Sequence, residues 1–269
     1  MDDVARTVLA LAILLLVAGV VPLVDGVRQA RAVVWSAVRG AVQLLVVGLV
    51  LGAVFRAPLA VLPVLAVMVA AATATVTPRL AELPVRRRWW RPVAVVAAVT
   101  TGAAVTASVV FATGALALEV RNVVAFGGIS VGGAMTASTL AGRRFVAELH
   151  GRRPEVEGKL ALGATMRQAN ADLVGVAVAE ALVPALDQTR TTGLVTLPGA
   201  FVGALFGGAS PLAAARFQLV VLVGLLAAES VAAVVLLRLL ADVPFLPAAA
   251  TPAPSRSPLR AHRLAFWRP

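Results

Sequence analysis

The stretch FQLVVLVGLLAAESVAAVVLL, residues 217–237, decides the fold class of this chain. It runs for 21 residues with a single charged side chain, Glu229. About 20 apolar residues in an α-helix span the hydrocarbon core of a bilayer, which is roughly 30 Å thick. The stretch is therefore long enough and apolar enough to cross a membrane as one helix.

Six more stretches toward the N-terminus contain no charged residue. They are residues 7–24, 40–55, 57–78, 92–118, 122–142 and 191–215. The shortest has 16 residues, and it can still span because Arg39 and Arg56 at its ends can reach outward to the membrane surface. The sequence predicts an all-α integral membrane protein with about seven transmembrane helices, placed in the cell membrane as a multi-pass protein.

The basic residues gather in alternate gaps between these stretches. Of the 24 Lys and Arg residues, 20 lie in the gaps before the second, fourth and sixth stretches or after the seventh. The four on the other side are Arg6, Arg56, Arg121 and Arg216. Because cytoplasmic loops carry the excess of Lys and Arg, we expect the N-terminus outside and the C-terminus in the cytoplasm.

Composition divides the chain into two parts. Residues 1–243 are expected to form one domain of packed transmembrane helices. From residue 244 onward Pro, Ala, Ser and Arg dominate without an apolar period, which predicts a disordered, basic cytoplasmic tail over 244–269. The first stretch could be a cleaved signal peptide, but Asp2 and Asp3 precede it and no Ala-x-Ala site follows, which favours a retained helix.

The net charge of +11 does not indicate a nucleic-acid partner, because the basic residues flank apolar helices instead of lining a soluble face. Anionic lipid headgroups are the expected partners of the arginines in residues 86–91, where Trp89 and Trp90 suit the membrane interface. The chain has no cysteine, which excludes disulfides, iron–sulfur clusters and thiolate metal sites.

One polar connection, about residues 143–190, is long enough to meet a soluble partner. It contains seven basic and six acidic residues. A short exposed helix is expected from Glu155 toward Gly163, where glycine allows the chain to turn. A second helix is expected from Met166 to about Leu186, lying at the interface or against the bundle and ending near Pro184. A plain surface loop is the alternative.

The segment 159–165, KLALGAT, resembles a known family together with ALVP at 181–184, Asp187 and GLVTLPG at 193–199. Further matching positions are Trp35, Ser36, Arg39, residues 43–45, Gly48, Gly203, Gly207, Gly208, Pro211 and Gln218. Over about residues 30–240 the chain is similar to the FetB-type ABC transporter permeases. These are implicated in bacterial iron export and include plant aluminium-sensitivity permeases.

The resemblance implies a homodimer that works with a separate cytoplasmic ATPase. The residues agree, because a phosphate-binding loop needs Gly-Lys followed by Ser or Thr, and the only lysine, Lys159, precedes Leu160. We therefore expect no enzyme activity and no bound cofactor in this chain, with ATP and Mg on the partner. Contact with that ATPase is assigned to Glu157, Lys159, Gly163, Ala164 and Thr165.

Glu229 is the one acid well inside a predicted span, and a central charged residue costs roughly 2.5 to 3.5 kcal/mol on insertion scales. It is either a cation or proton site or a packing carboxyl that is protonated or paired, for example with Gln43 or Arg216. Pro198 can break the sixth helix and expose carbonyl groups near Thr196. The predicted transport pathway consists of Met135, Thr136, Thr196, Pro198 and Glu229.

Glycines recur every four residues in several stretches. They are Gly48 and Gly52, Gly128 and Gly132, and Gly199, Gly203 and Gly207. At this spacing small residues favour tight helix packing or a dimer contact, and the alternative is that they leave room for cargo.

The sequence assigns no metal ligand, because His150 and His262 are isolated and no intramembrane carboxylates cluster. Three functions stay open: the membrane subunit of an ATP-driven exporter of iron-like metal ions, a secondary transporter with Glu229 as proton relay, and a membrane scaffold. A non-metal cargo such as a lipid or nucleotide sugar is a further alternative. Glycine and proline residues interrupt the fifth and sixth stretches. This argues against the scaffold, since a passive anchor needs no interrupted helices.

Overall fold

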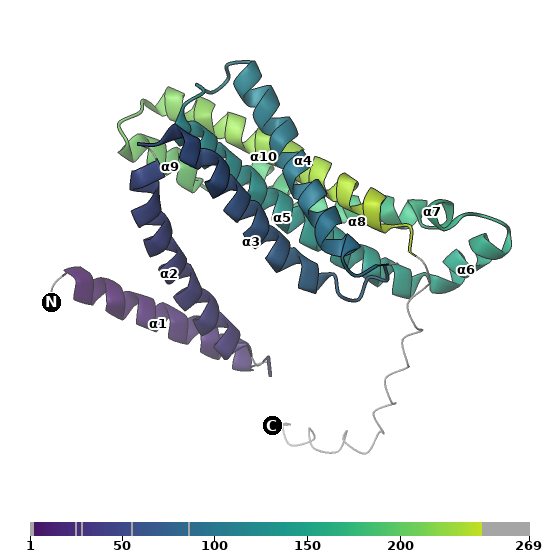
Figure 1. Ribbon diagram of the computed structural model, residues 1–269. Helices are drawn as coiled ribbons and strands as arrows, with labels where there is room; N and C mark the ends of the chain where they lie inside the picture. Colours follow the sequence, from purple (N-terminus) through teal and green to yellow (C-terminus); the bar gives the residue numbers. More distant parts are fainter. Residues whose placement is uncertain (1–2, 25, 28, 55, 86, 244–269) are drawn as a thin grey trace, which may run out of the picture. The chain divides into compact units, whose positions relative to one another are not determined.

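The structure is a computed structural model that describes residues 3–24, 26, 27, 29–54, 56–85 and 87–243. The predicted tail, 244–269, lies outside the described residues. The named elements in these ranges are all helices, so the all-α fold is confirmed (Figure 1). Six are long and apolar enough to cross a membrane: α1 (Asp3–Val24), α2 (Ala30–Val54), α3 (Val61–Arg79), α4 (Trp90–Ala112), α5 (Val120–Gly151) and α10 (Pro211–Leu240).

The remaining described elements are shorter or more polar. They are the 3-10 turn η1 (Pro58–Ala60) and helices α6 (Arg153–Ala161), α7 (Met166–Ala169), α8 (Ala171–Thr191) and α9 (Gly199–Phe206). The chain divides into two compact units, residues 1–61 and residues from 62 onward.

The first unit is a hairpin of α1 and α2. Helix α1 ends in a tight turn in which Gly26 has φ +75° and donates to Leu23 O at 2.9 Å, while Val27 N donates to Pro22 O at 3.0 Å. This pair of bonds is a Schellman ending, which needs a left-handed residue, usually glycine. The two helices lie side by side at Gly19, where an added Cβ would meet the Ala30 Cβ at 3.5 Å, an ordinary van der Waals contact.

The second unit is a bundle in which α3, α5 and α10 run in one direction. Along α5 and α10 the facing residues advance together: Phe126 meets Gly224, and Gly133 meets Leu225 and Glu229. Helices α3 and α5 are parallel by the same criterion, because α3 contacts Gly127 and Gly128 near its start and the residue after its end contacts Gly142.

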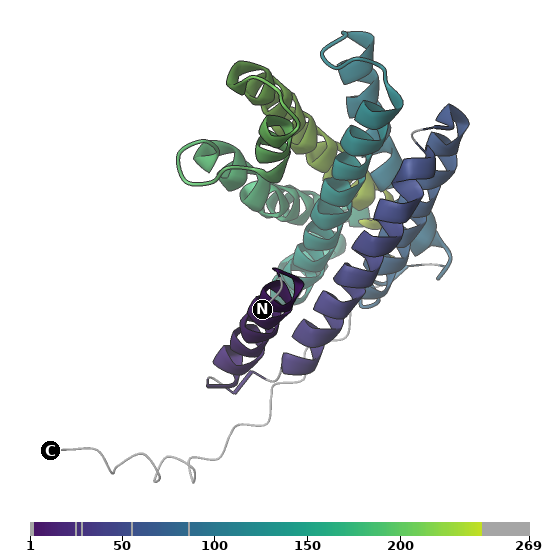
Figure 2. The same cartoon turned by 90° about the vertical axis from the view of Figure 1, so that its left-hand side faces the viewer.

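Helices α4 and α8 run in the opposite direction. Gly102 in the middle of α4 packs on Ala228 of α10, and Trp90 at the start of α4 donates to Leu239 O near the end of α10 at 3.2 Å. Arg144 late in α5 pairs with Glu180 of α8. Figure 2 shows the same helices turned by 90°, with the turn between α8 and α9 at one end of the bundle.

Small residues hold the bundle together. A Cβ on Gly102 would lie 2.5 Å from the Ala228 carbonyl oxygen, so only glycine permits this backbone approach. Alanines fill much of the core, including Ala98, Ala134, Ala141, Ala177 and Ala232. Of the predicted ladder glycines, Gly128 meets Met68, and Gly207 meets only carbonyl oxygens of α9. The other five have no described neighbour within 4 Å in their own unit: Gly48, Gly52, Gly132, Gly199 and Gly203. Their packing against another chain stays a prediction.

The sixth uncharged stretch, 191–215, does not form one membrane-length helix. After α8 the chain turns through residues 192–198, forms the eight-residue α9, and turns again at Gly208, which has φ +88°. Ser210 then caps α10 by accepting from Ala213 N at 3.3 Å. Glycines at both turns and Pro198 between them stop the helix, although the apolar length would suffice.

The polar connection also differs from expectation. Helix α5 continues to Gly151, beyond residue 142, and α8 continues to Thr191, so the expected helix end near Pro184 is wrong. Pro184 lies within α8 and is exposed. The buried face of α8, with Leu173, Ala177 and Ala181, packs on α5 and α10, so the helix lies against the bundle and is not a surface loop.

Candidate functional site

Two polar regions stand out in the second unit: the segment 152–172 at the end of the bundle, called the elbow below, and a small cavity inside the bundle. The elbow holds α6, the turn after it and α7. In α6, Pro154 begins the helix, Glu155 lies in the first turn and Lys159 in the last. These positions suit a proline without a donor and the charges of the helix dipole.

Gly163 ends α6 with φ +89°. Its N–H donates to Leu160 O at 2.9 Å, and Ala164 N donates to Lys159 O at 3.0 Å, which is again a Schellman ending. Thr165 then forms a capping box with Gln168, in which Thr165 N donates to Oε1 at 2.8 Å and Gln168 N donates to Oγ1 at 3.3 Å. The direction of the chain through the elbow is therefore fixed locally.

Asn170, between α7 and α8, ties the elbow to the end of α10. Its Nδ2 donates to Ala241 O at 2.9 Å, and the side chain is fully buried. A buried amide with a partner on another element fixes the position of that element. The elbow is thus anchored at its C-terminal end.

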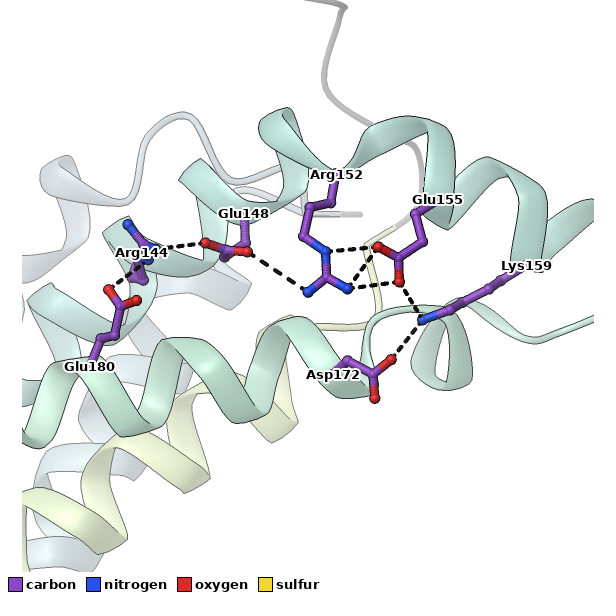
Figure 3. A network of polar contacts seen from close by, with 7 residues as sticks. All are labelled: Arg144, Glu148, Arg152, Glu155, Lys159, Asp172 and Glu180. Carbon is purple, nitrogen blue, oxygen red and sulfur yellow. Dashed lines mark hydrogen bonds and ion pairs between the residues drawn. The ribbon is translucent and has the colours of Figure 1, made fainter.

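A continuous network of ion pairs links the elbow to α5 and α8. Its members are Arg144, Glu148, Arg152, Glu155, Lys159, Asp172 and Glu180 (Figure 3). Positive and negative side chains alternate along it. Each pair is at least partly exposed, so each alone contributes little to stability, but together they fix the relative positions of three helices.

Lys159 forms the elbow half of this network. Its Nζ lies 2.7 Å from Asp172 Oδ2 and 3.0 Å from Glu155 Oε1. The hydrogen bonds to Asp172 and Glu155 raise the pKa of Lys159, and the hydrogen bond from Lys159 lowers the pKa of Asp172. Hydrogen bonds from Lys159 and Arg152 likewise lower the pKa of Glu155. All three groups are therefore charged near neutral pH.

Arg144 forms the bundle half. Its guanidinium contacts Glu148 at 2.9 Å within α5 and Glu180 of α8 at 2.7 Å. Glu148 also lies 3.9 Å from Arg152, which pairs with Glu155 at 2.7 Å. The network therefore reaches from the middle of α6 to the middle of α8 by way of α5.

The predicted ATPase-contact residues are all in the elbow, but they do different things. Lys159 joins the network, Gly163 and Ala164 form the turn, and Thr165 caps α7. Glu157 pairs with Arg153 at 2.7 Å, outside the network. Arg144, Glu148 and Asp172 are not among the residues predicted from the sequence. The four-residue spacing of Arg144, Glu148 and Arg152 could have predicted the part of the ion-pair network that lies along α5.

The cavity between α5, α8 and α10, called the inner cavity below, has a volume of about 260 Å³. It is open to the surface, since Thr136, Pro184 and Gln188 in its lining are exposed. Its polar lining residues are Thr136, Gln188 and Glu229, and the others are apolar or glycine. Glu229 is only 8% exposed. Among the described residues of the second unit it has no hydrogen-bond or ion-pair partner, so the predicted pairing with Arg216 is not present there, and the predicted pairing with Gln43 of the first unit stays a prediction.

Gly133 makes room for the Glu229 carboxylate. A Cβ on Gly133 would lie 2.7 Å from Glu229 Oε1 and would also clash with Leu225. Gly132 lines the same cavity, yet a Cβ on it would have no neighbour within 4 Å. Gly133 therefore leaves space for the carboxylate, whereas Gly132 lines the cavity without contacting another side chain.

The five predicted pathway residues are separated by the structure. Thr136 and Glu229 line the same cavity, and Met135 packs against the main core. Thr196 and Pro198 lie in the turn between α8 and α9, where Thr196 O accepts from Gly193 N at 2.8 Å. Two of the five thus share a site, and their part in transport stays a prediction.

A second, larger cavity of about 960 Å³ opens between the end of α3 and α5. Charged and titratable residues line it: Arg79, Glu82, Arg143 and His150. Thr136 and Leu140 of α5 line both cavities, so their side chains lie between the inner cavity and this second cavity. In the part of the chain that the structure describes, no three His, Cys, Asp or Glu side chains are grouped to hold a metal ion.

Comparison with known proteins adds a family. Residues 5–245 match the model of an "Uncharacterised protein family (UPF0014)". The chain is 29% identical to the "Probable iron export permease protein FetB" of Escherichia coli over 87% of this chain and 89% of that protein. It is 32% identical to the UPF0014 membrane protein YjkA of Bacillus subtilis over 75% and 79%.

A plant protein matches as well: the UPF0014 membrane protein STAR2 of Oryza sativa is 35% identical over 74% of this chain and 69% of its own length. No solved structure matches the chain significantly.

Proposed function

Because the chain belongs to the UPF0014 family of multi-pass membrane proteins, we propose that it is the membrane subunit of an ABC transporter that exports an iron-like metal cargo. ATP and Mg belong to a separate cytoplasmic ATPase, and this chain hydrolyses nothing. The observation that carries the proposal is the elbow, a helical projection at one end of the bundle that is tied by charge pairs into two bundle helices.

The proposed topology has seven crossings, with α8 as the sixth. Helices α5 and α10 are parallel and both long enough to span, so the chain must return across the membrane between them. Helix α8 is antiparallel to α5 and provides that return. The elbow, the end of α3 and the end of α10 then share one side with most of the basic residues, which places them in the cytoplasm.

In this proposal ATPase closure moves the elbow and the elbow moves the bundle. Force on α6 reaches α8 through Lys159 and Asp172, and it reaches α5 through Arg152 and Glu148. The buried Asn170 transmits it to the end of α10. These three helices enclose the inner cavity, so a movement of the elbow changes the cavity directly.

The iron-like cargo is proposed from the printed name of the Escherichia coli relative. The chain's own donors are hydroxyl, amide and carboxylate oxygens, which suit hard ions or the outer atoms of a metal complex. A lipid or a nucleotide sugar is the alternative cargo. A second copy of the chain and anionic lipids are the further proposed partners.

A secondary transporter is the second candidate, favoured by the isolated Glu229 carboxylate in its cavity. Uptake or efflux driven by a pH gradient in liposomes that contain no ATP would select it. Transport that requires both ATP and a partner protein would reject it.

A crosslinking experiment in living cells tests the elbow. A photoreactive amino acid is placed at Leu162 in the turn of the elbow, which is 90% exposed, and, as the matched control, at Leu194 between α8 and α9, which is 93% exposed. We expect Leu162 to crosslink to a protein that contains a Gly-x4-Gly-Lys-Ser/Thr loop, identified by mass spectrometry, and Leu194 to give no such product. Equal products from both positions, or none from Leu162, would contradict the proposal.

A further inference from the structure

We propose that the cavity between α5, α8 and α10 is a binding site for one singly charged cation, a proton or an alkali-metal ion, with Glu229 as its only charged ligand. The inference deepens the proposed function and depends on it only in placing these helices in the membrane. The first observation is the cavity itself, about 260 Å³ in volume, into which Glu229 projects while only 8% exposed.

The second observation is that no side chain among the described residues of the second unit pairs with the carboxylate. The residues of α5 and α8 that line the cavity are all uncharged. Arg144 and Glu180 pair with each other at 2.7 Å, and Asp187, which is next to Gln188, pairs with Arg190 at 3.8 Å. On α4 the only charged residue is Arg91, which donates to Leu83 O, and α9 has none.

Charges on α10 itself are also distant. Arg216 lies 13 residues before Glu229, and Arg238 lies 9 residues after it. At a rise of about 1.5 Å per residue, both are more than about 10 Å away along the helix. An ionised carboxylate that is nearly buried in an apolar bundle must be compensated by a cation or neutralised by a proton.

The neutral groups around Glu229 can complete a small oxygen site. Thr136 donates its hydroxyl proton to Gly132 O at 3.1 Å, so its oxygen keeps lone pairs for a cation. Gln188 contributes an amide to the same cavity. One carboxylate and neutral oxygens balance a single positive charge, whereas a divalent ion would leave a net charge in an apolar site.

The charged residues at the end of α3 do not line the inner cavity either. Arg79 and Glu82 line the neighbouring cavity together with Arg143 of α5.

The test is chemical labelling of the purified full-length chain in lipid nanodiscs, without any ATPase. Dicyclohexylcarbodiimide, an apolar reagent, modifies protonated carboxyls in apolar surroundings, and peptide mass spectrometry locates the product. We expect modification at Glu229 that falls at least about tenfold between about pH 5 and about pH 9 if a proton is the ligand. If an alkali-metal ion is the ligand, added NaCl or KCl suppresses it at constant pH.

Two glycine variants serve as a matched pair. Gly133→Ala places a methyl group against Glu229 Oε1 and is expected to reduce the labelling or its cation dependence at least about fivefold. Gly175→Ala adds the same methyl group on the exposed face of α8, outside the lining of the cavity and where nothing lies within 4 Å, and it should label as the wild-type chain does. If Gly133→Ala does not fold, Thr136→Val tests the oxygen ligand instead and should weaken protection by the cation at least about threefold, or shift the pH midpoint.

Three results would overturn the proposal. They are no modification of Glu229 at any pH, modification that neither pH nor salt changes, and protection by MnCl2 at about a tenth of the effective NaCl concentration, which indicates a divalent site. Because no ATPase is present, a negative result leaves the proposed ATPase contact standing. Failure of the elbow to crosslink would likewise leave the labelling result intact.

Discussion

Helix α8 and the segment that follows it show opposite relations between sequence and structure. Residues 171–191 carry Asp172, Glu180, Asp187 and Arg190, yet they form a 21-residue helix packed along the bundle. Residues 191–215 carry no charge, yet the longest helix wholly within them is the eight-residue α9, in which no residue is buried. Apolar content therefore does not by itself decide which segment traverses the bundle.

The comparison teaches that the position of charges matters more than their number. In α8 Asp172, Asp187 and Arg190 lie toward the two ends, and Glu180 in the middle is paired with Arg144. Leu173, Ala177, Ala181 and Ala185 repeat every four residues and form a narrow buried face. In the following segment glycine and proline interrupt the helix on both sides of α9, and no apolar surplus restores the lost backbone hydrogen bonds.

The largest effect should come from overpacking the buried face of α8. Ala177→Leu adds bulk at a fully buried site and should lower the free energy of unfolding by about 1–3 kcal/mol. Ala179→Leu, on the exposed face of the same helix, is the control, and Gly203→Leu tests α9, where a Cβ meets nothing within 4 Å. Thermal unfolding in detergent measures all three. Equal losses for Ala177→Leu and Gly203→Leu would remove the contrast between the two regions.

A smaller effect is expected from the turn that leads into α8. Gly163→Ala forces a side chain onto φ +89° and should cost about 1–2 kcal/mol and lower ATPase stimulation by the proposed partner. Gly158→Ala, inside α6, should be neutral or stabilising, since alanine favours a helix more than glycine does. Thermal unfolding and ATPase assays of the pair provide the measurement. The account fails here if Gly158→Ala is the more damaging change.

Reversing the pair that holds α8 on α5 should have a smaller effect still. Glu180→Arg places two like charges together and is expected to destabilise by up to about 1 kcal/mol, because the pair is partly exposed. Adding Arg144→Glu restores the opposite charges and should recover most of the loss in a double-mutant cycle. Additive losses in the double variant would show that the pair does not bind α8 to α5.

Acidification should loosen the elbow only slightly. The pKa values of Asp172 and Glu155 lie below their ordinary values of 3.8 and 4.5, so the ion pairs stabilise the elbow above those values. This stabilisation is lost as the pH falls through the lowered pKa values. The raised pKa of Lys159 keeps its charge through the ordinary 10.5 and beyond.

Hydrogen–deuterium exchange, corrected for the intrinsic rate, can follow this change. Protection of residues 153–170 should fall between about pH 5 and about pH 3, with the midpoint below the ordinary carboxylate values. The segment 192–207 contains no charged residue and should show no such transition. Lys159→Met should reduce the transition in the elbow to the part that the Arg152–Glu155 pair contributes, and an unchanged transition in that variant would reject Lys159 as a source of it.

Much of the architecture could be predicted from the sequence because it depends on local composition. Six long helices, their approximate limits and the helix before Gly163 follow from apolar length and turn residues. The proposed crossing by α8 could not be predicted from the sequence, because Glu180 looks unfavourable in a span until Arg144 is placed beside it.

Only part of the inner cavity could be predicted from the sequence. Glu229 and Thr136 were predicted from the cost of burying a charge and from their positions. Gln188 and the space that Gly133 leaves for the carboxylate depend on the packing of three helices that are far apart in the sequence. Thr196 and Pro198 were chosen because a broken helix often lines a pathway, whereas here the break lies in a turn at the end of the bundle.

The crossing of α8 is the central claim, and cysteine accessibility tests it most directly. The chain has no cysteine, so single variants such as Leu162→Cys and Leu194→Cys carry no background. A membrane-impermeant maleimide should label Leu194→Cys on intact cells and Leu162→Cys only after permeabilisation. Labelling of both positions from the same side would contradict the account, because α8 would then not cross the membrane.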